Sequence, residues 1–226
     1  MSLSVAFSAL LAGIIVWALL VNKLRVRPWE AQALAPAGSG FDAVPAKRIG
    51  LWIFLAVITS LFCLFVSAYY MRMGSHAGHG GGDWAAISDP PILWLNTVLL
   101  ILSSVAMQSA RAAVTLGKSE QTKLRLLAAG LLTGAFLIGQ FVAWRELRVS
   151  EYFTPNNPAV AFFYVLTAVH GLHLLGGLFV WGRTLARSLR PDVELIDVRL
   201  SVELTSVYWH YLLLVWLGLF AVLLST

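Results

Sequence analysis

The residues of this chain best suited to chemistry lie inside its last apolar run, where Glu203 is followed by Tyr208, Trp209 and His210. The run, residues 201–226, is otherwise almost entirely aliphatic or aromatic and is long enough to cross a bilayer. An ionisable group inside a membrane helix costs roughly 2.5 kcal/mol or more, so it is rare there and usually has a function. An acid and an imidazole seven residues apart in such a helix first suggest an active site.

A second pair, His170 and His173, lies three residues apart and so on about one face of the preceding apolar run. At about 1.5 Å per residue, His173 and His210 lie at similar depths, roughly 13 Å from the basic ends of their helices, where they could share one layer. Three histidines on two helices supply neither the ligand pairs of a di-haem cytochrome nor the larger set of a haem–copper core. The sequence therefore favours a polar layer that joins two helices and binds lipid, with no metal site and no catalytic residue.

Composition places the chain among polytopic membrane proteins. Of its 226 residues 59% are hydrophobic and 12% are charged, whereas soluble domains are about 45–50% apolar and about 25% charged. The net charge of +5 fits cationic loops held at the cytoplasmic face, so no nucleic-acid partner is expected. The single cysteine, Cys63, can form neither an internal disulfide nor a Cys-based metal site.

Six apolar runs of about 20 residues each have the length that an α-helix needs to span a bilayer. Their continuous Leu- and Ala-rich character favours helices over strands, so we expect an all-α, polytopic membrane helix bundle of six transmembrane helices. Residues 1–22 are predicted to form an extra N-terminal helix, 23–48 a cytoplasmic linker and 49–226 a five-helix core. The runs are Leu3–Val21, Gly50–Met71, Pro91–Ala113, Leu126–Trp144, Ala159–Trp181 and Ser201–Thr226.

Loop charges predict the orientation of these helices. Lys and Arg residues gather in the connections after the first, third and fifth runs, and few lie on the other side, which is the positive-inside pattern. Both termini are therefore expected on the outer side of the membrane. The basic side holds Lys23, Arg25, Arg27, Lys47, Arg48, Arg111, Lys118, Lys123, Arg125, Arg183, Arg187, Arg190 and Arg199, and the other side holds Arg72, Arg145 and Arg148.

Two further groups of residues predict packing between helices. Polar side chains on neighbouring turns of the third run are typical of interhelical hydrogen bonds, each contributing on the order of 1 kcal/mol. Glycines spaced by four residues in the fourth run allow close approach of helix backbones. The polar residues are Asn96, Thr97, Ser103 and Ser104, joined by Gln140 on the fourth run, and the glycines are Gly130 and Gly134.

Taken in order, these residues resemble subunit III of haem–copper terminal oxidases. The sequence His170-Gly171-Leu172-His173 is similar to the family's His-Gly-Leu-His signature, and Glu203 seven residues before His210 resembles its last helix. Further similarities extend the match over about residues 48–226, with the spacing preserved across five helices. They are Asn96-Thr97 with Ser103-Ser104, the start of the first core helix at 50–55, and Gln140.

The resemblance implies a non-redox accessory subunit of a proton-pumping oxidase that oxidises cytochrome c or quinol and reduces dioxygen to water. Such a subunit packs mainly against subunit I, which carries the haem and copper, and belongs to a complex with subunit II. The resemblance also implies bound phospholipid, protection of the catalytic subunit, guidance of oxygen, and a place in the bacterial cytoplasmic membrane with both termini on the periplasmic side.

The chain departs from the family pattern where carboxylates are expected, at Ile58, Ala143 and Leu213. These departures favour, as an alternative, the subunit III-like protein that accompanies nitric oxide reductases. A haem-binding electron carrier that uses His170, His173 and His210 is a further alternative. A transporter would need broken helices or an inverted repeat, and the sequence shows neither.

Overall fold

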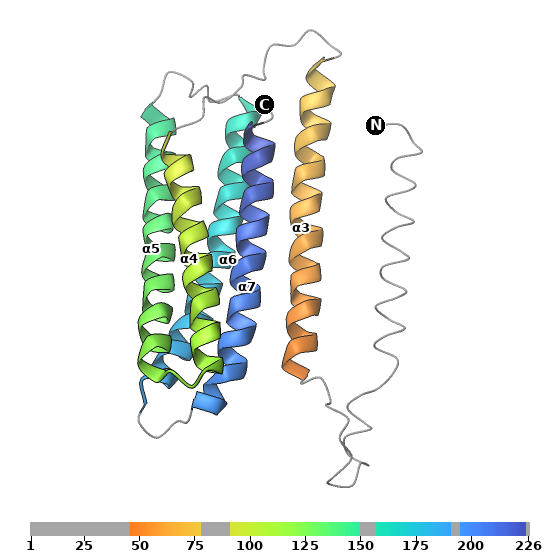
Figure 1. Cartoon of the computed structure of the whole chain (residues 1–226). Helices are drawn as coiled ribbons and strands as arrows, with labels where there is room; N and C mark the ends of the chain where they lie inside the picture. The colour runs from red at the N-terminus through yellow and green to blue at the C-terminus, as the bar shows by residue number, and fades with distance from the viewer. Residues whose placement is uncertain (1–45, 78–90, 150–156, 191–194, 225–226) are drawn as a thin grey trace, which may run out of the picture. The chain divides into compact units, whose positions relative to one another are not determined.

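The computed structural model describes residues 46–77, 91–149, 157–190 and 195–224, and these residues form five helices and no strand (Figure 1). All five are long and apolar enough to cross a membrane, which confirms the predicted all-α membrane bundle. The predicted N-terminal helix, 1–22, and most of the predicted linker lie outside the described residues. The helices are α3 (Ala46–Ala77), α4 (Pro91–Thr115), α5 (Ser119–Val149), α6 (Pro158–Ser188) and α7 (Leu195–Leu224).

The helices are longer than the apolar runs that predict them. The 31 residues of α5 measure about 46 Å at 1.5 Å per residue, whereas the hydrocarbon core of a bilayer is about 30 Å thick. The predicted run, 126–144, corresponds to the apolar middle of this helix. Its first turns carry Glu120, Lys123 and Arg125, charged residues that suit the membrane surface, where the helix continues because its backbone bonds remain internal.

Helices α4 to α7 form a closed ring, in which α4 contacts α5 and α7, and α6 contacts the same two helices. From Phe54 onward, α3 packs on α6 and α7 through a single stripe of side chains. Phe62 lies 5.6 Å from the ring of His173 and Tyr69 lies 5.5 Å from the ring of Phe162. The hydroxyl of Thr59 is 2.9 Å from that of Tyr211 on α7.

A three-residue turn joins α4 to α5, and its backbone conformation at position 117 favours glycine. Gly117 has a φ of 71°, a left-handed conformation that L side chains rarely adopt. The amides of Gly117 and Lys118 bond back to the carbonyls of Val114 and Ala113 at 3.3 and 3.0 Å, the pattern of a Schellman cap. The chain therefore reverses within one helix end and places α4 and α5 side by side (Figure 1).

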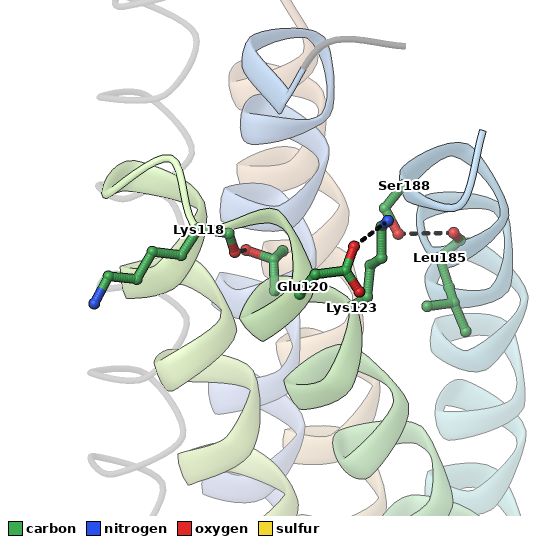
Figure 2. A network of polar contacts seen from close by, with 6 residues as sticks. Lys118, Glu120, Lys123, Leu185 and Ser188 are labelled. Carbon is green, nitrogen blue, oxygen red and sulfur yellow. Dashed lines mark hydrogen bonds and ion pairs between the residues drawn. The ribbon is translucent and has the colours of Figure 1, made fainter. Parts of the chain in front are cut away.

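Beside this turn, polar contacts lie at the neighbouring ends of α5 and α6, each within its own helix (Figure 2). Lys123 pairs with Glu120 one turn earlier, at 2.8 Å, and the Ser188 hydroxyl donates to the Leu185 carbonyl at 2.8 Å. At the opposite end of the ring, Asn157 caps α6 by accepting from the Ala159 amide, and Pro158 occupies the first turn, where no amide hydrogen is needed.

Candidate functional site

The centre of the ring is a cluster of hydrogen bonds built around Trp209 on α7. The indole Nε1 donates to the Ser103 hydroxyl of α4 at 2.8 Å and to the Thr133 hydroxyl of α5 at 3.2 Å. The two hydroxyls are 2.7 Å apart, and both lie within 3.0 Å of the Ala129 carbonyl. One hydroxyl hydrogen can therefore bond to that carbonyl and the other to the neighbouring hydroxyl, so this cluster joins three helices with every polar atom paired.

A second buried tryptophan, Trp216, lies two turns further along α7. Its Nε1 donates to the Thr97 hydroxyl of α4 at 3.0 Å, and Thr97 in turn donates to the carbonyl of Leu93. The ring centroids of Trp216 and of Phe136 on α5 lie 4.9 Å apart, and the two rings are nearly perpendicular. The predicted interhelical residues Ser103 and Thr97 of α4 therefore do bond between helices, and both accept from tryptophans of α7.

His170 lies at the same level and is fully enclosed, with an exposed fraction of 0%. Its ring lies 5.3 Å from Trp216, 6.0 Å from Phe136 and 6.4 Å from Phe62. Neither ring nitrogen has a hydrogen-bond partner among the described residues. Aromatic rings of three helices therefore enclose His170, and no hydrogen bond among the described residues joins it to the predicted polar layer.

Replacing His170 with leucine is expected to leave the free energy of unfolding unchanged or to raise it by about 1 kcal/mol. An unsatisfied buried polar group costs about 1–3 kcal/mol, which an apolar side chain of similar size does not incur. The measurement is a titration of the full-length chain from mild detergent into sodium dodecyl sulfate. His173→Leu is the control, since His173 already bonds to the Val169 carbonyl at 2.8 Å. A loss exceeding about 1 kcal/mol at His170 would mean that its nitrogens are paired.

Two glycines expose backbone carbonyls to aromatic side chains of a neighbouring helix. Side chains on a helix lean toward its N-terminus, so a glycine uncovers the carbonyl one turn earlier. At Gly130 the Trp181 ring of α6 occupies the place of a Cβ, and its Nε1 donates to the Leu126 carbonyl at 2.8 Å. At Gly177 the ring of Tyr208 does the same, and its hydroxyl donates to the His173 carbonyl at 3.0 Å.

The other predicted packing residues of α5 differ in their surroundings. A Cβ on Gly134 would meet nothing within 4 Å among the described residues, so this glycine takes no part in a close helix contact there. Gly139, by contrast, is covered by the Asn96 amide of α4. The amide nitrogen of Asn96 donates to the Gln140 side-chain oxygen at 3.5 Å, which links the predicted polar residues of α4 and α5 within the core.

Tyr208, Trp209 and His210 are consecutive, and between them they contact three helices. Tyr208 bonds to α6 and Trp209 to α4 and α5, whereas the Nδ1 of His210 lies 3.3 Å from the Ser104 hydroxyl on the outer side of α4. His210 is exposed, while His173 lies against α3. His173 and His210 therefore face different neighbours, because side chains two residues apart on α7 point in different directions. Their common depth stays a prediction, and the bond from Tyr208 to the His173 carbonyl is compatible with it.

A groove runs along the outer side of α4 and α7, next to His210. Its volume is about 370 Å³, and its lining combines Ile101, Val105 and Leu213 with Gln108 and His210. The Ser206 hydroxyl of α7 donates to the Gln108 side-chain oxygen at 3.4 Å. Leu213, where the family resemblance implies a carboxylate, therefore faces this groove, whereas Ile58 and Ala143 are buried.

Glu203 lies near the start of α7 and forms an ion pair with Arg199 one turn earlier, at 3.2 Å. Its side chain is 15% exposed and that of Arg199 is 51% exposed, so the pair lies at the edge of the fold. Exposed ion pairs of this kind contribute about 0.3–0.5 kcal/mol. Because Glu203 lies in the first turns of α7 and pairs with the exposed Arg199, it takes no part in the aromatic cluster that encloses His170.

Several residues that build this core were not among the predicted site residues. Thr133 is the only polar side chain between Leu126 and Ile138, which is a signal that could have found it. Trp181 and Gly177 carried no such signal, because their role depends on a contact between two helices. Within the described parts of the chain, no three His, Cys, Asp or Glu side chains lie close enough together to hold a metal ion.

Comparison with known proteins gives a consistent result. The family model described as cytochrome c oxidase subunit III matches residues 31–225. A cytochrome bo(3) ubiquinol oxidase subunit 3 from Pseudomonas putida is 27% identical, over 80% of this chain and 86% of the relative. A cytochrome c oxidase subunit 3 from Synechocystis sp. is 26% identical, over 88% of both chains. A probable cytochrome c oxidase subunit 3 from Mycobacterium bovis is 28% identical, over 71% and 80%.

Proposed function

The chain belongs to the cytochrome c oxidase subunit III family, and from this premise we propose that it is the non-redox accessory subunit of a proton-pumping terminal oxidase. In this proposal the complex reduces dioxygen to water, the haem and copper reside in subunit I, and this chain stabilises that subunit. Relatives named for cytochrome c oxidase and for ubiquinol oxidase match equally well, so either electron donor is compatible with the chain.

The observation that carries the proposal is that the buried polar side chains bond to one another between helices. Trp209, Ser103 and Thr133 bond to one another, and Trp216 bonds to Thr97, so their hydrogen-bonding capacity holds helices together. Among the described residues, the histidines of α6 and α7 do not gather into a haem or copper ligand set. His170 is enclosed by aromatic rings, and His210 faces the opposite side of α7 from His173.

Lipid binding, guidance of oxygen and contact with subunit II are parts of the same proposal, as is the place in a bacterial cytoplasmic membrane. Exposed apolar side chains along all five helices support a chain surrounded by lipid and partner helices. In the ring, the basic residues Arg111, Lys123, Arg187 and Arg199 lie at the ends where α4 and α6 finish and α5 and α7 start. That end is proposed to face the cytoplasm.

Purification of the tagged full-length chain from membranes in mild detergent is expected to recover a catalytic subunit and a haem absorbance band. Because the described residues hold no group of side chains that could ligate a metal, the haem band should remain with the partner when the complex is dissociated. The measurements are mass spectrometry of the recovered chains and the optical spectrum of each fraction. Stoichiometric haem on the isolated chain would contradict the accessory role and favour an electron carrier.

A further inference from the structure

Two carboxamide side chains meet inside the ring, near the start of α4 and the end of α5. Asn96 and Gln140 are 0% and 4% exposed, and the Asn96 nitrogen donates to the Gln140 oxygen at 3.5 Å. This bond is long, since an N–H···O bond usually measures about 2.9–3.0 Å. The Asn96 oxygen and the Gln140 nitrogen have no hydrogen-bond partner among the described residues. The pair therefore leaves one acceptor and one donor unused.

The count of unused groups does not depend on which end of each amide carries the nitrogen. The two ends of a carboxamide have nearly the same shape. With both amides turned over, Gln140 donates to Asn96, and the Asn96 nitrogen and the Gln140 oxygen are then unused. With only one turned over, two like atoms face each other and the bond between the helices is lost. Every arrangement leaves at least one donor and one acceptor unused.

The side chains one turn away from this pair on the same helix faces are apolar. They are Leu93 and Leu100 on α4 and Phe136 and Ala143 on α5, and each is at most 2% exposed. A buried polar group without a partner costs about 1–3 kcal/mol, and most buried polar groups bond either to protein or to water. A small molecule that bonds to both unused groups removes this cost.

Water has the chemistry that the pair requires. One water molecule can accept from the amide nitrogen and donate to the amide oxygen, and buried waters bond to polar groups that otherwise lack partners. His170, the other described residue with unpaired buried atoms, does not share this ligand. The rings that surround it, those of Phe62, Phe136 and Trp216, provide no acceptor that a water could bond to as its second partner.

We propose that the amides of Asn96 and Gln140 bind an internal water molecule, which completes the hydrogen-bonded link between α4 and α5. Ala143, one turn after Gln140 on the same face of α5, contributes only a methyl group beside the amide. Two turns further along α4, direct bonds from Trp209 join the same two helices to α7. The water-binding pair therefore joins α4 and α5 at a second level. This inference goes beyond the proposed function and does not depend on it.

The test is X-ray radiolysis of the full-length chain in mild detergent, because a bound water then yields a hydroxyl radical that oxidises the side chains next to it. The reporters are Phe136, one turn before Gln140, and Trp216, whose ring contacts Phe136 at 4.9 Å; both are 0% exposed. Trp209 is the matched control, since it is 1% exposed and its cluster has every polar atom paired. Mass spectrometry should show Trp216 oxidised at least about threefold faster than Trp209.

A double variant, Asn96→Leu with Gln140→Leu, removes both bonding partners of the water and keeps side chains of similar size. It should lower the oxidation of Trp216 to the rate of Trp209, while circular dichroism shows unchanged helix content. Equal oxidation of the two tryptophans in the unmodified chain would overturn the proposal, as would fast oxidation of Trp216 that persists in the double variant. If the double variant does not fold, the comparison within the unmodified chain decides alone.

Discussion

Trp209→Ala is expected to lower the free energy of unfolding of the full-length chain by about 3–5 kcal/mol, the usual cost of removing a large buried aromatic side chain. Trp209 is 1% exposed and joins α7 to both α4 and α5. The measurement is a titration from mild detergent into sodium dodecyl sulfate, followed by circular dichroism. Trp209→Phe should cost less, about 2 kcal/mol, since most of the packing remains while the Nε1 hydrogen bonds are lost.

The matched control is Phe179→Ala on α6, which removes an aromatic side chain that is 68% exposed. Because that side chain faces away from the ring, its loss should change the free energy of unfolding by less than about 0.5 kcal/mol. Equal losses from Trp209→Ala and Phe179→Ala would mean that the core does not lie between α4, α5 and α7.

Gly130→Ala is expected to destabilise the chain by about 1–3 kcal/mol through overpacking, and by about 1 kcal/mol more through the hydrogen bond from Trp181 to the Leu126 carbonyl. The added Cβ would occupy the position of the indole ring, so the ring must move and its Nε1 leaves the carbonyl. The titration used for Trp209 measures this loss, and a change in the fluorescence of Trp181 should accompany it.

Gly134→Ala, one turn further along α5, is the control with the opposite expected sign. It gains the helix preference of alanine, about 0.5–1 kcal/mol, and its Cβ meets nothing within 4 Å among the described residues. If both alanine variants stabilise the chain, Trp181 does not pack on Gly130 as described. Two variants with the same chemistry thereby test one contact between α5 and α6.

The sequence predicted the helices well and the directions of their side chains poorly. The thickness of a bilayer fixes the length of an apolar run, so the spans could be counted directly. Which side chain a residue contacts depends on the rotation of its helix about its own axis, and the length of an apolar run does not predict that rotation. Ser103 and Ser104 are adjacent, yet Ser103 faces Thr133 in the core while Ser104 faces His210 at the groove.

The aromatic surroundings of His170 could not be predicted from the sequence either. A histidine in an apolar run suggests a hydrogen-bonded or ligating group, since most buried polar groups have partners. The rings that enclose His170 come from residues far apart in the chain, Phe62, Phe136 and Trp216. The family resemblance located the histidine but carried no information about these neighbours.

The short turn at Gly117 also bears on how the protein is made. Only three residues separate α4 from α5, so the two helices emerge from the ribosome as a hairpin and can enter the membrane together. Ser103 and Thr133 both belong to this hairpin and can pair as soon as it forms. Trp209 is synthesised 76 residues after Thr133, so during biogenesis the indole reaches a binding site that the earlier helices have already prepared.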